Sequence, residues 1–313
     1  MTPLNPAPPV APLPPLGEAQ RDVSNAATDT PAEPLTGRRL WSQMRQTPAG
    51  LPLSNFALVL AYEGSPFMGW QIQPHGPSVQ GELERVLTVL ARMPAVVHGA
   101  GRTDAGVHAL NQIAHVRLPA HLNLEKTLGS LNALLPEAIV VKAILPVDAE
   151  FHARHSARGK VYRYHIQNRP FPSAFARNRA WWLRRPLDVE AMREAASPLV
   201  GTHDFSAFRA KFCEARTPVR TLHRITFTEG EWGDGTLRIE MEGTAFLQHM
   251  VRIITGTLVA TGLGRLKPSA LAGILESRRR EEAGATAPPH GLHLARVLYE
   301  PGSYGPILSA QSG

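Results

Sequence analysis

The chain has 313 residues, 43% of them hydrophobic, which is enough for one large domain or two small ones with cores of their own. Its one cysteine, Cys213, excludes an intramolecular disulfide and a cysteine metal cluster, and it is typical of a reducing compartment such as the cytoplasm. The net charge of +7 favours a polyanionic partner, and no apolar run reaches the roughly 18 residues of a membrane span.

Residues 1–50 are predicted to form a disordered, proline-rich tail. They contain ten of the 28 prolines, and their four arginines balance four acidic residues. Such a segment buries too little apolar surface to offset the entropy lost on ordering. The excess positive charge therefore lies on residues 51–313.

The first half, residues 51–150, alternates between strand and helix patterns. Ser78 and Asn123 each precede apolar residues at helical spacing, where their side chains can cap the first turn. The predicted elements, in chain order, are a strand at 55–62, a helix at 79–92, strands at 95–99 and 112–118, a helix at 124–135 and a strand at 138–145.

The second half, residues 151–300, repeats this alternation, and residues 301–313 are assigned to a C-terminal tail. Asp188 is the expected N-cap of the first helix in this half. The predicted elements are a strand at 160–167, a helix at 189–199, strands at 220–228 and 235–242, and helices at 246–262 and 269–280. We therefore predict an α+β fold with two α/β subdomains, mainly antiparallel sheets and a central basic cleft.

The segment "GAGRTDAGVHAL", residues 99–110, is the strongest candidate for a site. Glycines at 99, 101 and 106 permit positive φ angles and a close approach of a ligand to the backbone. An ionised Asp104 in this loop can act as a nucleophile or a base, or it can simply cap a turn. The loop lacks the Lys-Ser/Thr pair of a P-loop, and no second copy supplies the carboxylate pair of an aspartic protease.

The segment "GRTDAGVHA" resembles the signature of the tRNA pseudouridine synthase A family. Further stretches resemble other motifs of that family in the same order and together cover about residues 55–300, which leaves the tail outside the resemblance. In chain order they are "YEGSPFMGWQIQP", "SVQGELERVL", "FHARHSARGKVYRYHIQN", "GTHDFSAFRA", "FLQHMVRIITGTLVATGLG" and "AGATAPPHGLHLARVLY".

This resemblance implies a pseudouridine synthase fold, a homodimer, and an enzyme that isomerises uridine to pseudouridine without a cofactor. The substrate it implies is tRNA, at positions 38–40 of the anticodon stem-loop, with the target base flipped out. Asp104 matches the catalytic aspartate and Tyr162 the tyrosine that contacts the substrate. Arg102 and Arg252 match the arginines of the signature and of the late helix.

The chemistry gives these residue types a physical role, and each also has a structural alternative. A paired uridine must leave its stack, so Arg102 can fill the gap or hold the flipped base, or else pair with Asp104. Tyr162 can stack on the base and help to remove the C5 proton, or it can be a core residue of a strand. Arg252 can be the ion partner of Asp104, or it can extend to water.

Four basic residues of the second half are expected to contact RNA phosphates, although each alone could be a solvated surface charge. They are Arg154, Arg158, Lys160 and Arg209. If they neutralise phosphates, the affinity for RNA falls steeply with salt.

Two other function classes remain open at this point. The pairs "HARH" (152–155) and "HGLH" (290–293) suggest a metal-dependent hydrolase, but neither has further ligands at a fixed spacing, so we predict no metal site. A non-catalytic RNA-binding module is the second alternative, and the presence of both Asp104 and Tyr162 disfavours it.

Overall fold

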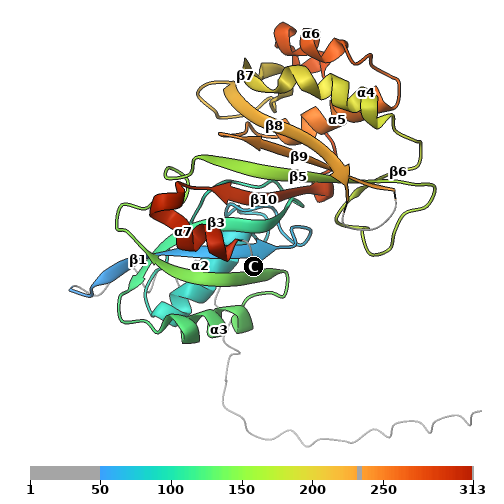
Figure 1. The fold of residues 1–313 in the computed structure, drawn as a ribbon. Helices are drawn as coiled ribbons and strands as arrows, with labels where there is room; N and C mark the ends of the chain where they lie inside the picture. Colours follow the sequence, from blue (N-terminus) through green and yellow to red (C-terminus); the bar gives the residue numbers. More distant parts are fainter. Residues whose placement is uncertain (1–49, 231–234, 312–313) are drawn as a thin grey trace, which may run out of the picture.

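The structure is a computed structural model that describes residues 50–230 and 235–311 (Figure 1). The predicted proline-rich tail lies outside the described residues except for Gly50. Within the two described ranges, no helix is both long and apolar enough to cross a membrane.

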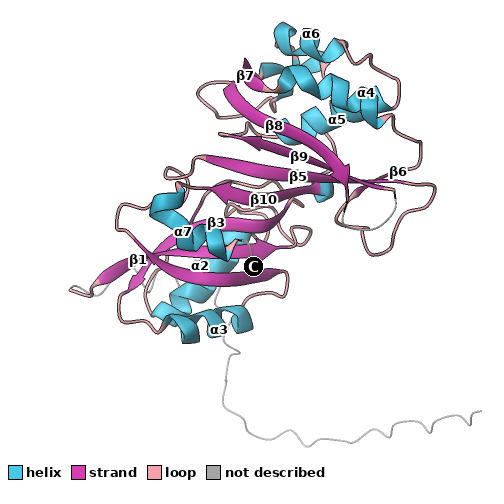
Figure 2. Ribbon diagram, in the orientation of Figure 1, coloured by secondary structure: helices cyan, strands magenta, loops and turns pink. Residues whose placement is uncertain are grey.

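Ten strands of the described chain form one sheet, in the order β4-β1-β3-β10-β5-β9-β8-β7, with β2 paired to β3 and β6 to β5. The strands are β1 (Leu53–Tyr62), β2 (His98–Gly99), β3 (His108–Pro119), β4 (Ile139–Val147), β5 (Gly159–Asn168), β6 (Trp181–Leu183), β7 (Gly201–Asp204), β8 (Val219–Glu229), β9 (Thr236–Gly243) and β10 (Leu292–Leu298). All pairs are antiparallel except β3 with β10 and β5 with β6. With its helices, this sheet confirms the predicted α+β class (Figure 2).

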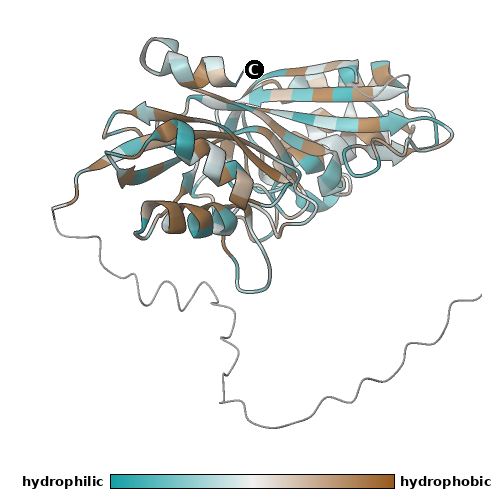
Figure 3. Cartoon of the chain, turned by 90° about the horizontal axis from the view of Figure 1, so that it is seen from below, coloured by the Kyte–Doolittle hydropathy of each residue, from teal (hydrophilic) through white to brown (hydrophobic). Residues whose placement is uncertain are grey.

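Five helices lie on one face of the sheet, and α7 lies on the other (Figures 1 and 3). They are α2 (Val79–Ala91), α3 (Leu124–Leu134), α4 (Val189–Ala196), α5 (Met250–Gly262), α6 (Ala270–Ser277) and α7 (Pro301–Ala310). Because helices cover both faces of the first half, β1 is buried continuously from Asn55 to Leu60. The three predicted N-caps are confirmed, since the side chains of Ser78, Asn123 and Asp188 each accept a bond from the backbone of the first helical turn.

Strand β10 joins the two halves and was not predicted. It comes from the end of the second half, yet it pairs with β3 of the first half and with β5 of the second. Its register places His293 opposite His108 on β3 and Leu292 opposite Tyr164 on β5. One sheet therefore runs through both predicted subdomains, and their division at residue 150 stays a prediction.

Several predicted boundaries differ from those observed. The helix expected at 246–262 begins at Met250, because His249 has a φ of 62° and interrupts the helical backbone before it. The strand expected at 95–99 is reduced to β2, and the helix expected at 269–280 ends at Ser277. The C-terminal tail contains α7, whose glycines and prolines gave no helical pattern.

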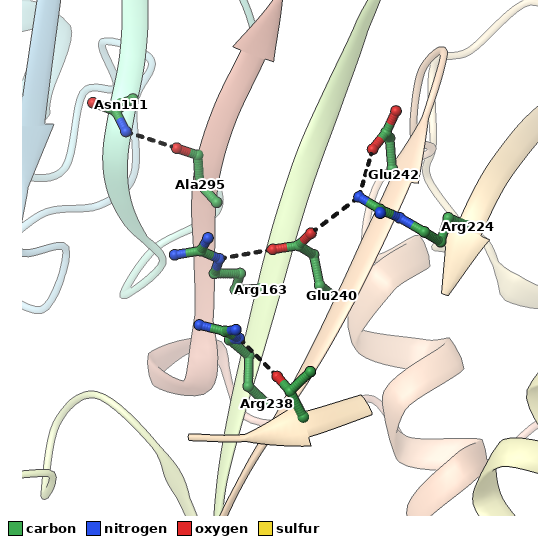
Figure 4. A network of polar contacts seen from close by, with 8 residues as sticks. Asn111, Arg163, Arg224, Arg238, Glu240, Glu242 and Ala295 are labelled. Atoms are coloured by element: carbon green, nitrogen blue, oxygen red, sulfur yellow. Dashed lines mark hydrogen bonds and ion pairs between the residues drawn. The ribbon is translucent and has the colours of Figure 1, made fainter. Parts of the chain in front are cut away.

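A polar network covers the outward face of the second half, away from α4, α5 and α6 (Figure 4). Arg163 Nε donates to Glu240 Oε2 at 2.9 Å, and Arg224 Nη2 donates to Glu242 Oε2 at 3.1 Å. Because side chains alternate along a strand, Arg163 points away from the face that carries Tyr162. This face of β5, β8 and β9 is thus occupied by ion pairs.

Three histidines lie in contact where β3, β10 and β5 meet, with His108 stacked on His293 and His165 edge-on to it. The ring centroids of His108 and His293 are 4.6 Å apart, and those of His165 and His293 are 4.8 Å apart. Burial lowers the pKa of all three, that of His165 to about 3, although the charge of Glu63 opposes the effect at His108. The rings are therefore neutral in the folded protein at neutral pH.

We expect the protein to lose stability on mild acidification because of these histidines. Their folded pKa values lie below the unfolded value of about 6.5, so their contribution is complete above that pH and is lost as the pH falls. Each histidine that stays neutral in the folded protein lowers the free energy of unfolding by about 1.4 kcal/mol per pH unit below about 6.5. Urea unfolding between pH 7 and pH 5 measures this slope, which His165→Phe should make shallower; an equal slope in both proteins would contradict it.

Candidate functional site

Asp104 lies in the loop between β2 and β3, and α5 supplies its main partner. Arg252, in the first turn of α5, places Nη1 3.0 Å from Oδ2 of Asp104. The same guanidinium donates from Nε to the carbonyl oxygen of Ala287 at 2.8 Å, which fixes its orientation. The expected ion pair is present, and it joins two segments 148 residues apart in the sequence. The carboxylate of Asp104 keeps 27% of its surface exposed, whereas Arg252 keeps only 13%.

His249 is a member of this site that the sequence analysis did not select. Its Nε2 lies 3.4 Å from the same Oδ2 of Asp104. Burial lowers its pKa against the opposing effect of Asp104, so the ring is neutral at neutral pH. His249 has a positive φ and directly precedes α5, so two residues of one short segment, His249 and Arg252, contact Oδ2 of Asp104. Helical periodicity carried no signal for this role, because the residue precedes the helix.

Tyr162 lies on β5 with 8% of its surface exposed, and its ring packs edge-on against Phe246 at 5.0 Å. Burial raises its pKa well above the usual value for a phenol, and the charges of Tyr62 and Asp104 raise it further. Within the described residues its hydroxyl makes no hydrogen bond. The side chain therefore presents a neutral phenol close to the Asp104 carboxylate.

Two glycines of the Asp104 loop pack closely against side chains of the protein itself, where we expected them to leave space for a ligand. A Cβ on Gly101 would lie 2.9 Å from Cε of Lys160, and one on Gly99 would lie 2.5 Å from the Trp70 ring. Of the three glycines, only Gly106 has a positive φ, of 76°. The space at Gly99 and Gly101 that we expected a nucleotide to occupy is thus filled by the side chains of Trp70 and Lys160.

Lys160 is the one predicted RNA-contact residue that the structure brings beside the Asp104 loop. It lies two residues before Tyr162 on β5, and residues two apart on a strand share a face. Burial, and then the nearby charge of Arg154, lowers its pKa to about 8.

Arg102 contacts a residue of the second half of the chain. We expected it to lie either at the substrate or against Asp104. Its Nη1 lies 3.4 Å from Oε2 of Glu214, and both side chains are mostly exposed. Arg158 pairs with Glu300 at 3.4 Å, and Arg154 is exposed. Arg209 follows a short 3-10 helix and lies near the carboxylate of Asp204. No contact links Arg154, Arg158 or Arg209 to Asp104 in the described part of the chain.

Gly69 packs against the backbone of the Asp104 loop, and we expect Gly69→Ala to destabilise the protein. Gly69 has a φ of 94°, and a Cβ there would lie 2.5 Å from the carbonyl oxygen of Thr103 and 3.0 Å from the carbonyl carbon of Asp104. Strain of this kind costs about 1–3 kcal/mol. Urea unfolding measures the loss.

Gly129→Ala is the matched control. Gly129 lies inside α3 with nothing near the added methyl group, so the same change there should stabilise the protein by roughly 0.5–1 kcal/mol. Equal effects at Gly69 and Gly129 would show that the Asp104 loop does not depend on the close approach of Gly69.

A metal centre has no assembled ligand set in residues 50–230 and 235–311, where no group of three or more His, Cys, Asp or Glu is arranged to hold an ion. In the "HARH" pair, Nδ1 of His152 already accepts a bond from the backbone of Arg154. In the "HGLH" pair, Nε2 of His293 bonds to the carbonyl oxygen of Arg179.

A surface hollow lies between the start of α4 and the end of α5, lined among others by Asp188, Arg193, Gly262 and Lys267. Asp104 meets the opposite end of α5, about 18 Å away along a helix of 13 residues. This hollow is therefore separate from the site, and the central basic cleft stays a prediction.

Comparison with known proteins identifies the class. The family described as "tRNA pseudouridine synthase" matches residues 195–300, which include Arg252 and strand β10. The chain is 47% identical over 245 residues to a tRNA pseudouridine synthase A of Myxococcus xanthus, covering 78% of this chain and 92% of that one. It is 45% identical over 249 residues to the enzyme of that name from Paramagnetospirillum magneticum, covering 79% and 96%.

A third relative with the same name, from Acetivibrio thermocellus, is 42% identical over 247 residues, which cover 79% of this chain and all of that one. The chain belongs to the tRNA pseudouridine synthase A family.

Proposed function

We propose that this protein isomerises uridine to pseudouridine at positions 38–40 in the anticodon stem-loop of tRNA, with Asp104 as the nucleophile. The observation that carries the proposal is the contact of Arg252 with the Asp104 carboxylate, beside Tyr162, in a chain of this family. A guanidinium at 3.0 Å holds the carboxylate in one position, from which it can attack.

The reaction balances without a co-reactant. The Asp104 carboxylate bonds to the substrate as the glycosidic bond between the sugar and N1 of uracil breaks. The uracil rotates, its C5 bonds to the sugar, and the carboxylate leaves. The proton that C5 loses is matched by one gained at N1, so the product is an isomer of the substrate.

Tyr162 binds the uracil ring in this proposal as a neutral phenol. Its raised pKa disfavours the phenolate, so stacking on the base is its main contribution. A phenol that keeps its proton at neutral pH is a poor acceptor for the C5 proton.

Arg102 fills the space left by the extruded uridine. In the free protein its guanidinium pairs with Glu214, but both side chains are largely exposed and such pairs contribute only about 0–1 kcal/mol. The pair therefore breaks at little cost when an RNA phosphate or base offers a better partner.

The tRNA is larger than one subunit, and we propose a homodimer in the cytoplasm whose basic residues contact tRNA phosphates. Arg154, Arg158, Lys160 and Arg209 are the candidates, with Lys160 placed closest to the Asp104 loop. Light scattering at micromolar concentration tests the dimer, and a monomer would contradict it.

The decisive experiment maps pseudouridine in unmodified tRNA transcripts that carry uridine at position 38, 39 or 40. We expect product at these positions without added metal, and no product in transcripts with cytidine there. Affinity should also fall steeply with salt, by a slope close to the number of phosphates neutralised. Product only at other positions would show that the target uridines lie outside positions 38–40. Tight binding without product would favour a non-catalytic RNA-binding module.

A further inference from the structure

The segment between β5 and β6, residues 169–180, exposes two phenylalanines that do not pack into the core of the described protein. Phe171 is 77% exposed and Phe175 is 86% exposed. Two such side chains on one short loop make a candidate contact surface for another molecule. The question is which partner the surrounding residues fit.

This segment is held in shape by hydrogen bonds to the flanking strands β5 and β6. The backbone N–H of Ser173 donates to Oε1 of Gln167 at 2.7 Å, and Trp182 Nε1 donates to the carbonyl oxygen of Arg169 at 2.9 Å. Two residues of the segment, Ala176 and Ala180, are buried. The two phenylalanines are therefore presented outward from a fixed base, so ordering them on a partner costs little.

The end of the segment lies near the candidate active site, because the backbone of Ala180 bonds to His290, whose ring is close to Arg252. The carbonyl oxygen of Arg179 accepts a bond from His293 at 2.9 Å, and the backbone of Asn178 bonds to His108. His108 begins β3 four residues after Asp104. Because an extended chain spans at most about 3.5 Å per residue, the Cα of Phe175 lies within about 10 Å of that of Asn178.

The charge around the segment fits RNA. From residue 151 to residue 187 the chain contains nine arginines and lysines and no acidic residue. In the described structure, Arg177 and Arg179 are exposed and have no acidic partner. Phosphates would neutralise such cations, and unstacked bases would cover the phenylalanine rings, which is how single-stranded RNA is commonly recognised.

We propose that residues 169–180 are a second RNA-contact surface, on which Phe171 and Phe175 stack against unpaired loop nucleotides next to the target uridine while Arg177 and Arg179 bind the adjoining phosphates. This inference rests on the proposed function, because it takes the anticodon stem-loop as the substrate. It gives the enzyme a means to favour hairpins with an accessible loop over plain duplex RNA.

The test compares F171A/F175A with V140A/V200A, a control that shortens exposed apolar side chains on other elements. Binding is measured by fluorescence anisotropy on an anticodon stem-loop and on the same hairpin with abasic loop nucleotides. We expect F171A/F175A to weaken binding to the intact hairpin by at least about tenfold and to leave binding to the abasic hairpin unchanged. An unchanged affinity, or equal losses on both RNAs, would overturn the proposal.

The arginines have a test of their own. R177Q/R179Q should lower the slope of log affinity against log salt by about 1.5 on both hairpins, because each lost phosphate contact removes about 0.7–0.9. An unchanged slope would overturn their assignment.

Two further readouts separate the alternatives. If light scattering shows that F171A/F175A converts a dimer to a monomer, the surface belongs to a second copy of the chain and the RNA contact is overturned. If wild-type protein forms no pseudouridine in tRNA, the proposed function fails, while the contrast between intact and abasic hairpins still decides whether the phenylalanines contact loop bases.

Discussion

Asp104→Asn is expected to reduce pseudouridine formation by on the order of a thousandfold or more while leaving tRNA binding intact. The substitution keeps the shape of the side chain and removes the charge that makes it a nucleophile. Arg252 keeps its bond to the carbonyl oxygen of Ala287, so the guanidinium stays in place. Single-turnover conversion of a tRNA transcript, measured with enzyme in excess, gives the rate without interference from product release.

The control for this change is Asp188→Asn. Asp188 caps α4, and asparagine caps helices about equally well, so activity and stability should stay within the error of measurement. A modest loss of stability in Asp104→Asn is expected, because Arg252 is mostly buried and loses its ion partner. Full activity in Asp104→Asn would show that another group carries out the attack.

Tyr162→Leu is expected to have the second largest effect, and Tyr162→Phe a much smaller one. Stacking of an aromatic ring on a base is worth about 1–3 kcal/mol, which corresponds to a loss of roughly five- to 150-fold when leucine replaces the ring. Phenylalanine keeps the ring and its edge-on packing against Phe246, and the hydroxyl that it removes bonds to no described residue. The rate of conversion in the bound complex, together with the affinity, measures both variants.

This pair of variants also assigns the role of the hydroxyl. If Tyr162→Phe is as slow as Tyr162→Leu, the phenol takes part in proton transfer despite its raised pKa. If both variants convert tRNA as fast as wild type, the ring is a core residue of β5 and the substrate lies elsewhere.

Local signals in the sequence predicted the helices well where a cap and an apolar spacing coincided. Ser78, Asn123 and Asp188 begin α2, α3 and α4 as expected. Strand β10 was missed because its sequence, "LHLARVL", is buried on both faces and so lacks the alternation that marks a half-exposed strand. The start of α5 was misplaced because the left-handed backbone of His249 leaves no trace in periodicity.

The candidate site was predictable only in part. Asp104 and Arg252 were selected, and their contact was one of two roles expected for an arginine on a mostly apolar helix. The contacts of Arg102 with Glu214 and of Lys160 with the Asp104 loop were not predictable. They join positions far apart in the chain, and only the tertiary fold decides which of many surface charges meet.

The position of β10 affects the order in which the enzyme can become active during synthesis. A nascent chain that ends before residue 292 already carries Asp104, Tyr162 and Arg252, yet it lacks the strand that hydrogen-bonds β3 to β5. The ribosome adds about 5–20 residues per second and domains fold as units, so the two halves of the sheet join only after residues 292–298 have been made. Synthesis through β10 is then a precondition for catalysis, and fragments that end before residue 292 would leave cellular RNA unmodified.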